Sequence, residues 1–124
     1  MSKHSDSTAR RRSVPSVVIV APAPEMLDVW RYVLGRFEHV VSVQVADLSA
    51  TTTTVAQCRP FALLIEQDLL EFDAREFGAL ARDVGADVVT ADMRDGKESI
   101  AAAVVPKLRA ALARWRSREP PGRQ

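Results

Sequence analysis

The chain has 124 residues, of which 47% are hydrophobic and 27% charged, and its formal net charge is +1. These values predict one soluble domain with one core, and no run approaches the roughly 18 apolar residues of a membrane span or the apolar segment of a signal peptide. Cys58 is the sole cysteine, which excludes an intramolecular disulfide and a cysteine-based metal cage and points to the reducing cytoplasm.

The charges are sorted along the chain. Residues 1–16 carry four Lys or Arg against one acid, and residues 97–124 carry seven against two. Residues 17–96 hold thirteen acids and six bases, which makes the middle net negative by seven. Such asymmetry is typical of solvated ends, or of basic ends that meet nucleic acid, an acidic partner or the chain's own acidic face.

The first third of the chain predicts a strand, a helix and a second strand. Ser16 to Pro22 is a β-branched run without polar alternation, which is typical of a central parallel strand. Pro24 suits the first turn of a helix, and His39 to Asp47 predicts a strand at the sheet edge. The helix between them is indicated by an apolar stripe at steps of three and four: Leu27, Trp30, Leu34 and Phe37.

The middle predicts a short crossover and a third strand. Threonines are poor helix formers, but a parallel strand follows and needs a crossover, so we expect a short or irregular helix over Thr52 to Cys58. Asp47 or Ser49 is expected to cap this helix, and Pro60 to end it. The third strand is the continuous apolar run "FALLIEQ", residues 61–67.

The next helix has the clearest start signal in the sequence. Asp73 can cap it, Glu76 can reach back to the Asp73 amide, and Phe72 can pack on Phe77 as a hydrophobic staple. Gly85 is placed to end the helix in the left-handed conformation. The stretch "ADVVTAD", residues 86–92, then predicts a fourth strand.

Two arrangements fit the last segment. Apolar residues from Ile100 to Trp115 recur at helical spacing and favour one long helix. Pro106 argues against it, because a proline inside a helix costs about 3 kcal/mol. In the alternative, a helix runs from Pro106 to Arg118, and residues 101–105 form a fifth strand or a short turn.

The alternation of strands and helices predicts a three-layer, doubly wound α/β domain over residues 16–118, with a parallel sheet of four or five strands. Residues 1–15 and 119–124 are expected to be disordered tails. In such a sheet the binding crevice lies at the carboxyl ends of the strands. The residues expected there are Ala21, Pro22, Glu66 to Asp68, and Thr90 to Asp92.

Two stretches, "RPFALLIEQDLLEFDAREF" (residues 59–77) and "ADVVTAD", resemble the flavodoxin/CheY-like receiver domain of bacterial two-component response regulators. The resemblance covers about residues 17–115. In that family a strand ends in the phospho-accepting aspartate, and an Asp-Gly opens a helix seven residues later. Glu66 stands at the first position and Asp73 at the second, and Thr90 stands where the family has the threonine that ends its fourth strand.

The departures from the family decide the functional expectation. A receiver's first strand ends in an acidic pair that holds Mg²⁺, but Ala21 and Pro22 stand there in this chain. Without those ligands the electrostatic help for phosphoryl transfer is missing, so we expect neither metal, cofactor nor enzymatic activity. Glu66 either imitates the phosphorylated state or is a solvated acid at a strand end. Pro106 and Lys107 reverse the family's Lys-Pro order, so the lysine is not carried over and the fourth helix and fifth strand region is expected to be shortened.

We therefore expect a stand-alone pseudo-receiver that binds another protein of a signalling pathway without phosphorylation chemistry. Candidate contact residues besides the degenerate site are Asp68, Trp115, Arg114 and Arg116. A homodimer is left open. The alternative is a nucleic-acid-associated regulator that uses the Arg-rich ends.

Overall fold

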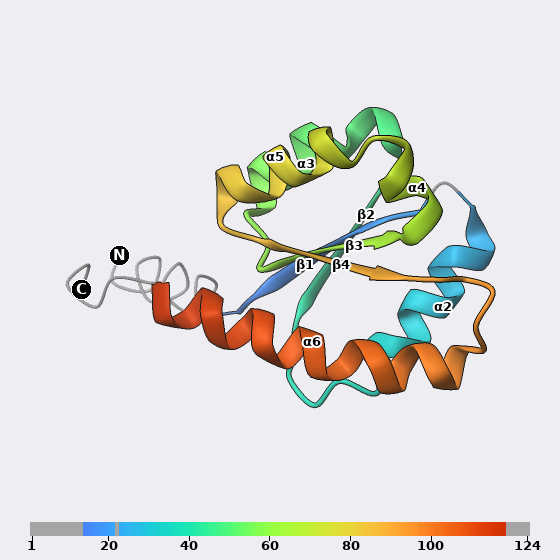
Figure 1. Ribbon diagram of the computed structural model, residues 1–124. Coiled ribbons are helices and arrows are strands. Elements are labelled where there is room, and N and C mark those ends of the chain that lie inside the picture. The colour runs from blue at the N-terminus through green and yellow to red at the C-terminus, as the bar shows by residue number, and fades with distance from the viewer. Residues whose placement is uncertain (1–13, 22, 119–124) are drawn as a thin grey trace, which may run out of the picture.

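Four parallel strands form one sheet in the order β2-β1-β3-β4. The computed structural model describes residues 14–21 and 23–118 (Figure 1). The strands are β1 (Ser16–Val20), β2 (Ser42–Ala46), β3 (Ala62–Glu66) and β4 (Asp87–Ala91). This is the strand order of flavodoxin-like doubly wound domains without their fifth strand, so the predicted fold class is confirmed with four strands.

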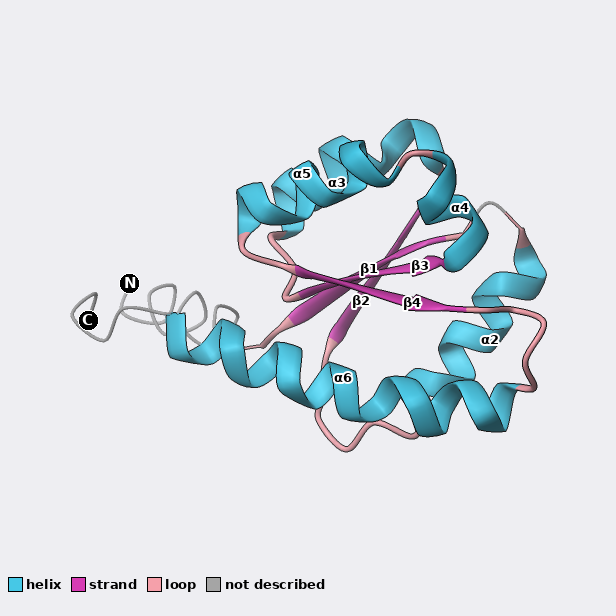
Figure 2. Cartoon of the chain, viewed as in Figure 1, coloured by secondary structure: helices cyan, strands magenta, loops and turns pink. Residues whose placement is uncertain are grey.

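Helices cover both faces of the sheet and make three layers (Figure 2). α2 (Pro24–Gly35) and α6 (Lys97–Arg118) pack on one face. The other face carries the short helix η1 (Leu48–Ala50) and α3 (Thr51–Cys58), α4 (Gln67–Phe72) and α5 (Ala74–Val84). Both faces are therefore buried, which is why β1 and β3 are uninterrupted apolar runs.

The core consists of two apolar clusters, one on each side of the sheet. Val17 and Ile19 of β1 belong to the cluster under α2 and α6, and Val18 and Val20 belong to the one under α3 and α5. This alternation follows from the two-residue period of a strand. β2 lies at the edge of the sheet, as its mixed composition predicted, and its first four residues are exposed.

The threonine-rich segment forms the predicted crossover helix, which begins at Thr51 rather than Thr52. The predicted cap of this helix is wrong, because α3 has no side-chain cap. Asp47 instead caps the preceding η1, where its carboxylate accepts a hydrogen bond from the Ala50 N–H at 2.9 Å. The buried Thr51 hydroxyl donates to the Asp47 carbonyl at 2.7 Å. The helix ends at Arg59, whose φ of 48° is left-handed, directly before Pro60.

The predicted capping box and staple at Asp73 are wrong. The sequence analysis missed the helix α4, which begins directly after β3. The Asp73 N–H belongs to the last turn of α4 and donates a hydrogen bond to the Leu70 carbonyl at 3.1 Å. Glu76 therefore finds no free amide there, and the Asp73 side chain makes no capping bond. Phe72 is 86% exposed and does not staple Phe77. Gly85 ends α5 with φ 75°, as predicted.

The last segment is one helix, α6, and the alternative with a strand at residues 101–105 is wrong. Pro106 lies inside the helix and removes the hydrogen bond to the Ala102 carbonyl. Both residues lie on the exposed face of α6, where water can solvate that carbonyl. None of the helices in the described part of the chain combines the length and the apolar character needed to cross a bilayer.

The predicted tails fall almost entirely on residues 1–13 and 119–124, which lie outside the described residues. Pro15, assigned to the first tail, instead belongs to the sheet. It is buried, and its carbonyl accepts a hydrogen bond of 2.8 Å from the Ser42 N–H.

Candidate functional site

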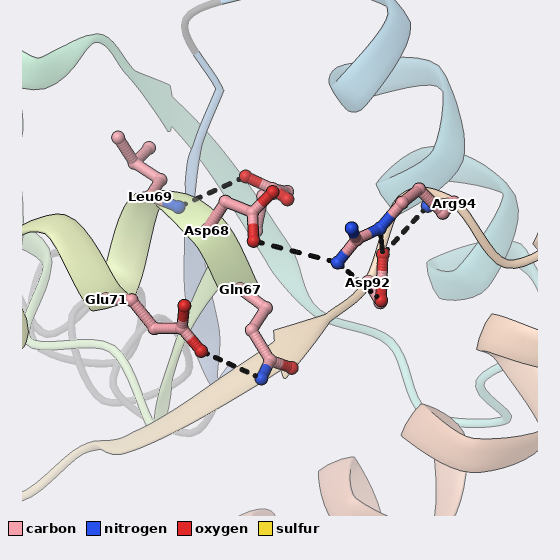
Figure 3. A network of polar contacts seen from close by, with 7 residues as sticks. Gln67, Asp68, Leu69, Glu71, Asp92 and Arg94 are labelled. Carbon is pink, nitrogen blue, oxygen red and sulfur yellow. Dashed lines mark hydrogen bonds and ion pairs between the residues drawn. The ribbon is translucent and has the colours of Figure 1, made fainter.

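Two aspartates, Asp68 and Asp92, contact one arginine, Arg94, at the carboxyl ends of β3 and β4 (Figure 3). Glu66 ends β3, Asp68 lies in the first turn of α4, and Asp92 follows β4. Arg94 comes from the loop between β4 and α6. Because β3 and β4 are adjacent and parallel, with Glu66 in register with Ala91, these segments leave the sheet side by side.

Glu66 is neither a solvated acid nor a free carboxylate in the crevice. It is 7% exposed, and its Oε1 accepts a hydrogen bond of 3.1 Å from the Leu69 N–H. The side chain thus caps α4 at its N-terminus, where a negative charge also interacts favourably with the helix dipole. The Glu66 carboxylate therefore makes a structural hydrogen bond.

Asp92 and Arg94 form a bidentate pair within one tight turn. Nε of Arg94 donates to Oδ1 of Asp92 at 2.9 Å, and the terminal nitrogen NH2 donates to Oδ2 at 3.0 Å. The Arg94 backbone N–H also donates to Oδ1, at 3.0 Å. The side-chain and backbone hydrogen bonds from Arg94 lower the pKa of Asp92 below its ordinary value of 3.8.

Arg94 also faces a second acid of the site, Asp68. Its NH2 lies 3.8 Å from Oδ1 of Asp68 (Figure 3). The pKa of Arg94 is raised by its hydrogen bond to Asp92 first, and then by the charges of Asp92, Asp68 and Glu66. The guanidinium is a fixed cation at this acidic edge. Within the described residues, no three His, Cys, Asp or Glu side chains are arranged to hold a metal ion.

The remaining residues of the predicted site contribute no ligand in the described structure. The half-buried Ala21 donates its backbone N–H to the Ala46 carbonyl at 3.2 Å and packs against the core. Thr90 is half-buried in register with Ile65, on the α5 side of the sheet. Pro22 lies outside the described residues.

Arg94 is the site residue that the sequence analysis missed. A lone arginine in a loop carries no catalytic or ligand signature, and the prediction stopped at the end of the fourth strand. A usable signal was nevertheless present, because an Asp-x-Arg directly after a strand allows the aspartate to accept the arginine's amide and its guanidinium together.

Trp115, Arg114 and Arg116 are not brought to this site. Arg114 pairs with Asp87 at the start of β4, and the half-buried Trp115 ring lies 6.5 Å from the Phe61 ring, just before β3. These positions are at the amino ends of the strands, the opposite edge from Glu66. Arg116 is exposed there.

A second feature lies on the helical face beside the acidic site. A groove of about 300 Å³ is lined by apolar residues of η1, α4 and α5, namely Leu48, Leu69, Phe72, Phe77 and Leu80. Asp73 and Glu76 stand on the same wall. This groove, with an apolar floor and acidic side chains, is here called the Phe72 groove.

Comparisons of the chain with protein-family models, with curated proteins and with solved structures found no match.

Proposed function

We propose that the protein is a pseudo-receiver that acts as a phosphorylation-independent, non-catalytic adaptor for another protein in cytoplasmic signalling in bacteria. The observation that carries this proposal is the Arg94 guanidinium, held by Asp92 and facing Asp68. It supplies positive charge at the edge of the sheet where receivers keep their divalent ion.

The chemistry of phosphoryl transfer explains why this arrangement argues against an active receiver. Making an acyl phosphate requires a cation that neutralises the phosphoryl oxygens as they approach a carboxylate. Arg94 is already engaged by Asp92, and β1 is followed by Ala21, which offers no acidic ligand. The Glu66 carboxylate is occupied by the Leu69 amide. The site therefore keeps a receiver's outline without its reactive groups.

The Phe72 groove supports the binding part of the proposal. Phe72 is 86% exposed, although burying an aromatic ring is strongly favourable. Exposed aromatic side chains beside an apolar hollow are typical of protein-binding sites. Asp73 and Glu76 favour a partner that combines an apolar anchor with Lys or Arg.

The test combines phosphorylation with binding. The purified protein is incubated with acetyl phosphate and Mg²⁺, and its intact mass is expected to stay unchanged. The same protein is then used as bait in an extract of its native cells, with and without acetyl phosphate, and the same basic partner is expected in both.

Two variants make this test specific. Phe72→Ala should weaken partner binding about tenfold or more, as expected for a buried anchor. Val14→Ala, which alters another exposed apolar residue, should leave it unchanged. A phosphorylated species would overturn the proposal, as would a partner retained equally by both variants. Affinity for DNA that falls steeply with salt would favour the nucleic-acid alternative.

A further inference from the structure

Within residues 14–21 and 23–118, β2 is an outer strand of the sheet and no further strand pairs with its outer edge. Its Ser42 N–H and Ala46 carbonyl hydrogen bond toward β1, to Pro15 and Ala21. Since backbone groups along a parallel strand point alternately to either side, the N–H and C=O groups of Val43 and Val45 point away from the sheet. Residues 42–46 contain no charge and no proline, the usual devices that protect such an edge.

The opposite edge of the sheet is better protected. Every residue of β4 is buried or half-buried, whereas four of the five residues of β2 are exposed. α6 packs beside β4, and its Arg114 pairs with Asp87 at the start of that strand. Of the two outer strands, β2 is therefore the one open to pairing.

Exposed apolar side chains gather around the same strand. Of the six large ones in residues 14–21 and 23–118, four lie in or next to β2: Val40, Val43, Val45 and Leu48. Val40, Val43 and Val45 also line a shallow hollow of about 430 Å³ together with Leu34 of α2. Such a concentration of apolar surface marks an interaction site.

We propose that a second copy of the chain adds its own β2 antiparallel to this edge, across a two-fold axis at Gln44. In this register Val43 lies opposite Val45 of the second copy, and Val45 lies opposite Val43. Each of these pairs exchanges both of its backbone hydrogen bonds, because all the groups involved point outward. The valine side chains meet on the α2 face as cross-strand pairs.

The surroundings of β2 favour a second copy over other occupants. Val43 and Val45 are equally far from Gln44 along the strand, so the exposed face of β2 is complementary to its own copy in the antiparallel register. His39, shortly before β2, lines the hollow together with Arg31 of α2, and Asp47 directly follows the strand. The neighbouring Glu38 is paired with Arg109 at 2.7 Å. Antiparallel pairing brings the basic start of one strand to the acidic end of the other, whereas parallel pairing would juxtapose like charges.

This inference does not depend on the adaptor function. Its first test is the oligomeric state of the full chain, measured by sedimentation from micromolar to the highest soluble concentration. A monomer–dimer equilibrium is expected. Val43→Lys should raise the dimer dissociation constant about tenfold or more, because each dimer would bury two ammonium groups beside the valine pairs. Val14→Lys should not change it.

A cysteine cross-link tests the register itself. Gln44→Cys, in a Cys58→Ser background, places the new thiol on the two-fold axis, where paired Cα atoms lie about 4.5 Å apart and a disulfide can form. Ser42→Cys places its thiol about 13 Å from its copy, too far for a disulfide. We expect mild oxidation to give a covalent dimer with the first variant and none with the second.

A chain that stays monomeric at every concentration overturns the proposal and leaves the edge to another occupant. A dimer that Val43→Lys leaves intact, or that cross-links through Ser42→Cys instead of Gln44→Cys, overturns it as well. The cross-link does not rely on a disruptive substitution, so misfolding of Val43→Lys would leave the test decisive.

Discussion

At the scale of single residues, the position of Arg94 is set by the residue two places before it in the chain. Asp92 holds both the backbone N–H and the guanidinium of Arg94. The contact closes within the turn after β4, so it needs no precise packing of distant helices. Asp68 of α4 lies 3.8 Å from the guanidinium that Asp92 holds in place.

The first prediction concerns the titration of Asp92. Its folded pKa is lowered, so the contact with Arg94 adds stability above the unfolded pKa near 3.8 and loses it as the pH falls through the folded value. An NMR titration of the carboxyl carbon should give a midpoint below 3.8. Arg94→Gln should move that midpoint up toward 3.8, while Arg114→Gln should leave it unchanged. An Asp92 midpoint unaffected by Arg94→Gln would contradict the described pair.

Individual residues differed in how far they could be predicted. Gly85 was predictable because a positive φ at a helix end favours glycine. Arg59 takes a similar left-handed conformation without being glycine, and no local pattern indicates that. Glu66 capping α4 was missed because glutamate is not among the preferred N-cap residues.

At the scale of elements, α6 carries a proline in its interior. The helix continues past Pro106 because buried residues on both sides hold it to the sheet and to α2: Ala101, Val104, Val105, Leu108 and Ala111. Tertiary packing here outweighs a local preference. The Ala102 carbonyl, which loses its hydrogen bond to the helix, lies on the exposed face, where water can solvate it.

The second prediction is that Pro106→Ala stabilises the protein. Restoring the hydrogen bond to Ala102 and removing the ring clash should add about 1–3 kcal/mol, less the small entropic benefit of proline in the unfolded chain. Urea unfolding followed by circular dichroism measures the gain. Lys107→Ala, at the exposed neighbour, should change the stability by less than about 0.5 kcal/mol. An unchanged or lower midpoint for Pro106→Ala would show that the proline fits without strain.

The elements were predictable where periodicity extended over several turns, as in α2 and α5. α4 was not, because it spans only Gln67–Phe72 and starts directly where a strand ends. Six residues are too few to show helical periodicity. α5 still begins after Asp73, but α4 takes the Asp73 amide away from the expected capping box, and Phe72 is exposed.

At the scale of the whole molecule, stability resides in a sheet buried on both faces. Leu64 is fully buried in the cluster under α2 and α6, while Phe72 is 86% exposed on the other side. Two large apolar residues that are only eight positions apart thus have opposite roles. One contributes to folding, and the other is available for binding.

The third prediction compares these two residues. Leu64→Ala should lower the free energy of unfolding by about 2–5 kcal/mol, because it leaves a cavity in a packed core. Phe72→Ala should change it by no more than about 0.5 kcal/mol. Denaturant unfolding of both variants provides the measurement. A large loss for Phe72→Ala would mean that this ring is part of the core rather than a contact.

The overall architecture could be predicted because alternating strands and helices with unbroken apolar strands leave few arrangements of a parallel sheet. The position of the acidic site could be predicted, but Arg94 could not be assigned to it, because its pairing with Asp92 depends on side-chain geometry in a turn. The difference between the two edges of the sheet was also beyond the sequence, because it depends on where α6 packs.

That difference fixes how many copies can assemble through the sheet. In the part of the chain that the structure describes, β2 is the exposed outer strand. A symmetric dimer therefore pairs the two β2 edges and leaves the better-covered β4 edges on the outside. Growth would stop at two chains, and a filament would require uncovering β4.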